Sequence, residues 1–269
     1  TEEAAEADLR RRVRELALRT RRLAARAPLT VPANPGFELP ESGERIPGWL
    51  HNAQRGVTIE LRAREQPPGG RAVDVKSTGP VASLVSDWFE MPATGRLAIE
   101  ASLATPDGKR QPPLRVAIEL AGGASYYRYS PIGAPPAHIP LTEPWAPYVF
   151  PFEDLPVAKG TRARVRFDLM GAGQASIDDV RVLDLVLSEG EQVGLAKIVS
   201  LTDLQLREGK LAQCAYTLEG FWPRYLARHV PLDEDRQARR TEPVAKPAAA
   251  PKSDTPDRVI DRLKKLKPF

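Results

Sequence analysis

The chain has 269 residues, of which 42% are hydrophobic and 28% charged, a composition typical of a folded domain with appendages. Its single cysteine excludes an internal disulfide and a thiolate-rich zinc site, and three scattered histidines argue against a histidine-built metal centre. The net charge of +4 arises at the two ends of the chain, so the middle lacks the basic stripe that nucleic-acid binding requires.

Two further expectations concern membrane-spanning segments and processing of the chain. No window approaches the roughly 18 consecutive apolar residues of a transmembrane helix, so no membrane-spanning segment is expected. The first residue is threonine, which predicts a processed or cut fragment; loss of a signal peptide is one interpretation of what preceded it.

Residues 1–28 are predicted to form one amphipathic helix that Pro28 ends. Apolar or small residues recur there at alternating spacings of four and three: Leu9, Val13, Leu16, Thr20, Leu23 and Ala27. The other faces are mostly Arg, Glu and Ala, so the stripe over residues 9–27 needs a helix partner that buries it. Two interpretations stay open: a coiled coil, and an amphipathic helix packed on the neighbouring domain.

Residues 29–186 change to short alternating runs interrupted by Pro and Gly, which is the pattern of strands and turns. The clearest runs cover 57–61, 97–103, 114–120, 127–129, 148–152, 163–169 and 175–182. About ten short strands without a helical period predict an antiparallel sandwich or barrel.

Residues 187–230 return to a helical period and are predicted to form a helical hairpin. Ser188 with Glu191 three residues later is a capping-box start. Cys214 occupies an apolar position of the second helical run, which predicts a buried, inert thiol.

The C-terminal part is predicted to be a linker followed by a short helix. Residues 231–254 are rich in Pro, Ala and charge, as linkers are. Residues 255–269 form a basic amphipathic pattern that suits a docking peptide or a membrane-surface contact.

Two motifs at the ends of the strand-rich region carry a resemblance. Asn34-Pro35-Gly36-Phe37-Glu38, followed by Ile46-Pro47-Gly48-Trp49, opens the region, and Ile177-Asp178-Asp179-Val180 closes it. Over about residues 31–186 the chain resembles family 4 and 9 type carbohydrate-binding modules, which share the galactose-binding-like jelly-roll. The run 219–223 is similar to helical extensions of uncharacterised, planctomycete-type bacterial surface proteins.

The resemblance and the helical flanks together predict the fold class. We expect a mainly β protein, an antiparallel jelly-roll β-sandwich with an N-terminal helix and a C-terminal helical hairpin. Its parts are a helix over 1–28, the module over 29–186, the hairpin over 187–230, a linker over 231–254 and a short helix over 255–269.

The resemblance also implies a structural calcium ion, with Glu38 and Asp178 or Asp179 as candidate ligands. Oxygen ligands of this kind suit a hard cation. The alternative is that a carboxylate accepts hydrogen bonds from a loop backbone. As neighbours in a strand, the two aspartates are expected on opposite faces.

Flat rings edged by polar groups are the usual means of sugar recognition. Phe37, Trp49 and Trp145 match positions that look structural in the resembling modules. This leaves four aromatic ligand candidates: Trp88, Tyr126, Tyr127 and Tyr129. By alternation, Tyr126 faces opposite to its two tyrosine companions, so one set must leave the core.

An outward row of charged residues lies in the strand over 163–169. Arg164 and Arg166 of this row are further ligand candidates, and the alternative is a solvated sheet face. A basic groove would favour an acidic glycan, and a neutral groove a plain polysaccharide.

No catalytic motif is present in the sequence: it has no Gly-x-Ser-x-Gly elbow, no phosphate loop and no His-Glu-x-x-His helix. We therefore predict a non-catalytic binding or interaction protein of the cell envelope or exterior, with a glycan or protein partner. One alternative is a structural or assembly subunit, in a homo-oligomer or larger assembly, whose flanking helices bind protein partners. A glycan-active enzyme fragment is the other.

Overall fold

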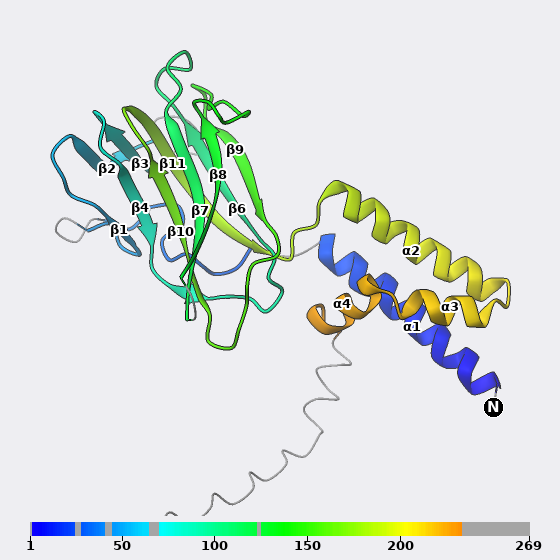
Figure 1. The fold of residues 1–269 in the computed structure, drawn as a ribbon. Helices are drawn as coiled ribbons and strands as arrows, with labels where there is room; N and C mark the ends of the chain where they lie inside the picture. The colour runs from blue at the N-terminus through cyan, green and yellow to red at the C-terminus, as the bar shows by residue number, and fades with distance from the viewer. Residues whose placement is uncertain (1, 25–27, 41–44, 65–69, 123–124, 233–269) are drawn as a thin grey trace, which may run out of the picture. The chain divides into compact units, whose positions relative to one another are not determined.

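The computed structural model describes residues 2–24, 28–40, 45–64, 70–122 and 125–232 (Figure 1). The predicted helix over 255–269, and the predicted linker beyond residue 232, lie outside these residues. None of the described helices is long and apolar enough to cross a membrane.

Two antiparallel sheets form the strand-rich part. The first sheet has the order β1 (Trp49–His51), β4 (Ala82–Ser86), β10 (Arg162–Leu169), β7 (Pro113–Ala121) and β8 (Tyr126–Gly133), with β5 (Phe89–Glu90) also paired to β10. The second sheet has the order β2 (Val57–Ala63), β3 (Arg71–Ser77), β11 (Gly173–Asp184), β6 (Leu97–Ala104) and β9 (Ala146–Phe152). The predicted mainly β fold, a jelly-roll sandwich with helices on both flanks of the chain, is confirmed.

Alternation along the strands builds the core between the two sheets. In β7 the apolar side chains of Leu114, Val116, Ile118 and Leu120 are buried, and their neighbours Arg115 and Glu119 lie on the outer face. β10 repeats the pattern, because the alanine, valine, phenylalanine and leucine between its charged residues are fully buried. The first sheet therefore has one apolar face and one polar face.

The opening motif closes one end of the core. Asn34 has a left-handed backbone (φ 51°), and its carbonyl accepts a hydrogen bond from the Trp49 indole (3.2 Å). Phe37 is fully buried against that indole, with ring centroids 5.1 Å apart. The backbone N–H of Val180 donates to the Pro35 carbonyl (2.8 Å), which joins the opening motif to the closing strand β11.

Four helices form a second cluster: α1 (Glu2–Ala24), α2 (Glu189–Arg207), α3 (Leu211–Leu218) and α4 (Phe221–His229). The predicted capping box at Ser188 and Glu191 is present at the start of α2. Three helices follow the sandwich, one more than a hairpin, because Gly220 starts a separate short helix.

The apolar stripe of α1 is buried inside this cluster. Leu9, Val13 and Leu16 pack with Leu195 of α2 and Cys214 of α3. The helix partner of α1 is therefore its own chain, which agrees with the second interpretation and not with a coiled coil between chains. Cys214 is fully buried, and burial raises the pKa of its thiol, as expected for an inert cysteine.

Candidate functional site

The outer face of the first sheet gathers most of the predicted ligand residues. In β10 the side chains of Arg164, Arg166 and Asp168 point away from the core. The register sets Arg164 beside Glu119 of β7, and Glu119 beside Tyr127 of β8. Residues that lie more than 40 positions apart in the chain thus meet on one surface.

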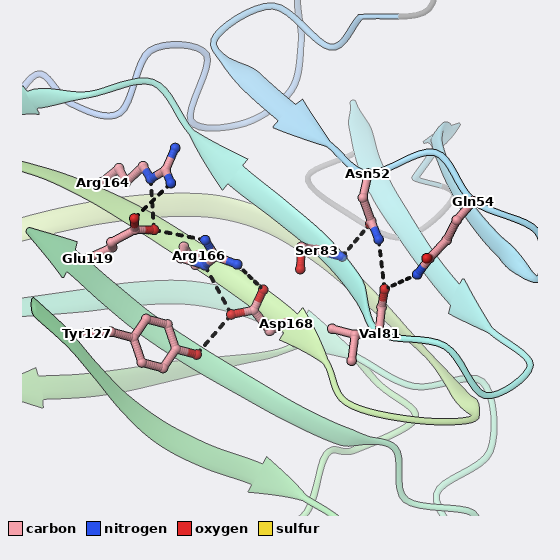
Figure 2. A network of polar contacts seen from close by, with 9 residues as sticks. All are labelled: Asn52, Gln54, Val81, Ser83, Glu119, Tyr127, Arg164, Arg166 and Asp168. Carbon is pink, nitrogen blue, oxygen red and sulfur yellow. Dashed lines mark hydrogen bonds and ion pairs between the residues drawn. The ribbon is translucent and has the colours of Figure 1, made fainter. Parts of the chain in front are cut away.

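The charged residues of this face form a connected chain, which we call the charged row: Arg164, Glu119, Arg166 and Asp168 (Figure 2). Arg164 donates two hydrogen bonds of 2.9 Å to the two oxygens of Glu119. Arg166 reaches Glu119 at 2.8 Å and both oxygens of Asp168 at 3.0 and 3.1 Å. The Tyr127 hydroxyl donates to Asp168 at 2.9 Å. Each carboxylate oxygen of the row therefore accepts at least one hydrogen bond.

These contacts shift the pKa values of Glu119 and Tyr127. Partial burial by itself would raise the pKa of Glu119, but the hydrogen bonds from Arg164 and Arg166 lower it below its ordinary value. Burial, together with the negative charge of Asp168, raises the pKa of Tyr127 to about 12. At neutral pH the Glu119 carboxylate is therefore charged and the Tyr127 hydroxyl is neutral, so Glu119 acts as an acceptor and Tyr127 as a donor.

Aromatic rings border the charged row, and arginines lie over them. The Arg164 guanidinium carbon is 4.3 Å from the Trp88 ring centroid, and that of Arg115 is 4.2 Å from the Tyr129 centroid. Tyr127 and Tyr129 are 40% and 44% exposed, with their centroids 5.9 Å apart. The rings are thus held in place and still partly open to solvent.

A shallow, open hollow lies over the Glu119, Arg166 and Asp168 part of the charged row, between β4, β10, β7 and β8. Its lining includes Arg115, Tyr127, Asp168 and Ser83. Asn52, which follows β1, fixes the β4 side: its side chain donates to the Val81 carbonyl and accepts from the Ser83 N–H, both at 2.8 Å (Figure 2). The hollow therefore has a fixed wall and a polar floor.

Five of the six predicted ligand residues lie on this face: Trp88, Tyr127, Tyr129, Arg164 and Arg166. Tyr126 does not, because it packs against the core, as alternation with Tyr127 requires. The interpretation from sequence missed Glu119 and Arg115. Both are charged residues at alternate positions of an apolar strand, and this pattern was the available signal.

The three candidate calcium ligands lie around Gly36, although Asp178 and Asp179 were expected on opposite faces of their strand. A Cβ atom added to Gly36 would be 3.7 Å from Asp179 Oδ1, 3.8 Å from Glu38 Cγ and 3.9 Å from Asp178 Oδ1. The expected opposite orientation of the aspartates is wrong, since both reach the same Arg64 Nη1, at 2.5 and 3.6 Å. A register shift after Asp178 and the left-handed backbone of Asp179 (φ 49°) turn the second side chain toward the first.

The described arrangement favours an arginine over a metal ion as the partner of these carboxylates. The side chains of Arg64 and Asp178 are 5% and 4% exposed and form the 2.5 Å ion pair. Glu38 accepts a hydrogen bond from the Arg71 N–H (3.0 Å), and Asp178 accepts one from the Asp179 N–H (2.7 Å). Among the described residues, no group of three His, Cys, Asp or Glu is arranged to hold a metal ion. The residues present do not fit the calcium ion that the resemblance implies.

This geometry predicts the response to calcium. We expect the melting temperature of the full chain to be the same, within about 1 °C, in 2 mM calcium and in excess chelator, because Arg64 already supplies the positive charge. Differential scanning calorimetry of metal-stripped protein measures this. A rise of several degrees on adding calcium, but not magnesium, would show that calcium binds here after all.

Comparison with known proteins gives a likeness of fold. No protein-family model matches the sequence, and no curated protein matches it. Similar solved structures include the enzymatically active domain of tailspike protein 4 of bacteriophage CBA120, at 14% identity and a TM-score of 0.41 over 56% of this chain and 21% of that one.

Two carbohydrate-binding modules are matched over nearly their whole length. The module TmCBM61, in complex with β-1,4-galactotriose, has 14% identity and a TM-score of 0.37, with 56% of this chain and 96% of that one covered. The family 11 module of Clostridium thermocellum, in complex with a β-1,3-1,4-mixed-linked tetrasaccharide, has 11% identity and a TM-score of 0.38, with 56% and 97% covered. At these identities and TM-scores the likeness assigns no ligand to this chain.

Proposed function

We propose that the chain is a non-catalytic glycan-binding protein whose binding surface is the outer face of β4, β10, β7 and β8. The observation that carries this proposal is that two half-exposed rings, Tyr127 and Tyr129, lie beside the hydrogen-bonded charged row. Rings offer sugars a flat apolar contact, and polar groups fixed by the fold set the orientation of the hydroxyls. Groups that are already held lose little entropy on binding.

The state of the carboxylates supports binding over hydrolysis. A glycosidase uses two carboxyl groups, one of which has a raised pKa so that it can donate a proton. Glu119 has a lowered pKa instead, and its oxygens accept three hydrogen bonds from arginines. Asp168 likewise accepts from Arg166 and from Tyr127. The lowered pKa of Glu119 is the opposite of what a proton donor to a glycosidic oxygen needs.

The test is retention of the full chain by neutral and acidic polysaccharides in affinity electrophoresis. We expect retention by at least one glycan, a loss of about tenfold or more in affinity for Trp88→Ala and Tyr129→Ala, and no release of reducing ends. Tyr216→Ala is the matched control, because this tyrosine is 84% exposed and belongs to α3 and to neither sheet. Equal losses in all three variants, or release of reducing ends, would contradict the proposal.

A protein-binding role is the second candidate, and one observation favours it. On α2 the exposed apolar residues Val193, Leu201 and Leu204 fall on the side opposite the buried Leu195 and Thr202. If a folded chain is retained by no glycan, this face of α2 is the next surface to test for a protein partner. The cell-envelope setting rests on the resemblance and stays a prediction.

A further inference from the structure

Not every arginine of the proposed binding face is paired with a carboxylate. Glu119 and Asp168 direct their hydrogen bonds to Arg164 and Arg166, and Asp168 also accepts from Tyr127. Arg115 sits directly opposite Asp168 in the β7 and β10 register. It nevertheless makes no ion pair or hydrogen bond with a carboxylate anywhere in the described part of the chain, whereas Arg166 bonds both oxygens of Asp168.

The surroundings of Arg115 keep its guanidinium at the surface of the hollow. Its carbon lies 4.2 Å from the Tyr129 ring centroid, so the planar group rests on a ring that is itself 44% exposed. Arg115 also lines the hollow, together with Ser83 and Tyr127. Stacking of this kind holds a guanidinium without using its N–H donors. The donors of Arg115 are thus positioned at a site where a ligand can reach them.

We propose that this face selects acidic glycans, with Arg115 binding the carboxylate of a uronic acid while the neighbouring sugar contacts Tyr129. The inference rests on the proposed function and adds to it the class of ligand. A planar carboxylate matches the two parallel N–H donors of an arginine, and such charge-assisted pairs are stronger than neutral hydrogen bonds.

The experiment compares one glycan backbone with and without its charge. We measure the affinity of the full chain for polygalacturonate, for its fully methyl-esterified form, for neutral galactan and for dextran sulfate. We expect binding to the free acid to exceed binding to the ester by on the order of tenfold, and we expect Arg115→Gln to remove that difference. Because the pair is charged, the preference should also weaken as the salt concentration rises.

Arg181→Gln is the matched control. It removes the same charge from an exposed position of β11, in the second sheet. An equal loss in Arg115→Gln and Arg181→Gln would mean attraction by net charge and would overturn the inference. A preference for dextran sulfate over polygalacturonate would overturn the uronic-acid assignment.

The outcomes also separate the two proposals. Equal binding to the acid and the ester, unchanged by Arg115→Gln but reduced by Tyr129→Ala, would overturn the acidic-glycan inference and leave glycan binding standing. If the wild-type chain is folded, as a cooperative melting transition would show, and no glycan retains it, both proposals are overturned.

Discussion

Arg64→Ala should reduce the free energy of unfolding by about 3–5 kcal/mol at pH 8, because it leaves the Asp178 carboxylate buried without its partner. Arg64 also places its guanidinium carbon 4.4 Å from the Trp145 ring centroid, so the substitution removes a packing contact as well. Urea denaturation followed by tryptophan fluorescence measures the change.

The pH dependence identifies the cause of this loss. Burial, only partly offset by Arg64, raises the pKa of Asp178 from 3.8 to about 6 in the folded protein. The folded state therefore holds this proton more tightly than the unfolded chain, and the stability contributed by the proton is present below pH 4 and lost as the pH rises toward 6. Without Arg64 the pKa rises further, so the decline extends to higher pH.

We therefore expect the difference between the wild-type protein and Arg64→Ala to be small at pH 5 and large at pH 8. Arg181→Ala is the control, because this exposed arginine lies on the same strand as Asp178. It should change stability by less than about 0.5 kcal/mol. A pH-independent loss would mean that Arg64 acts through packing alone.

Trp49→Ala should cost about 3–5 kcal/mol, the range for removing a large buried ring. The residue is 2% exposed, and its ring lies 5.1 Å from Phe37 and 6.2 Å from Phe167 between centroids. The substitution also leaves the Asn34 carbonyl without the indole donor that helps to hold the opening motif. We expect a lower urea midpoint with an unchanged slope.

Trp88→Ala provides the comparison for this loss. This substitution also removes a tryptophan ring, but from the partly exposed outer face of the sheet, where the ring lies beside Arg164. We expect a loss of about 1 kcal/mol there. Similar losses at the two tryptophans would contradict the assignment of Trp49 to the core and of Trp88 to the binding face.

The architecture of the module could be predicted from local pattern. Alternation in β7 and β10 identified which side chains face inward, since a buried face imposes period two on each strand. The capping box of α2 is likewise a signal contained in four consecutive residues. Signals of this kind do not depend on which segments meet in space.

The network of the binding face depends on long-range pairing, so it could not be read from spacing. Glu119 joins Arg164 and Arg166 only because β7 and β10 are neighbours in the sheet. The face of Asp179 was misassigned for another reason, because a single left-handed residue interrupts the alternation of β11. For α1 the amphipathic pattern showed that a partner exists and not which one, and the partner is the chain's own α2–α4 region.

The sharing of one apolar cluster by α1 and α2–α4 has a consequence for folding. The helical unit is discontinuous in sequence: its first helix ends at Ala24 and its second begins at Glu189, with the whole sandwich between them. During synthesis, more than 160 residues separate α1 from the first of its partner helices. Closing a loop of that length costs conformational entropy, and this cost is smaller if the sandwich has already folded and brought its ends together. Prior folding of the sandwich would thus lower the entropic cost of bringing α1 to the helices that bury it.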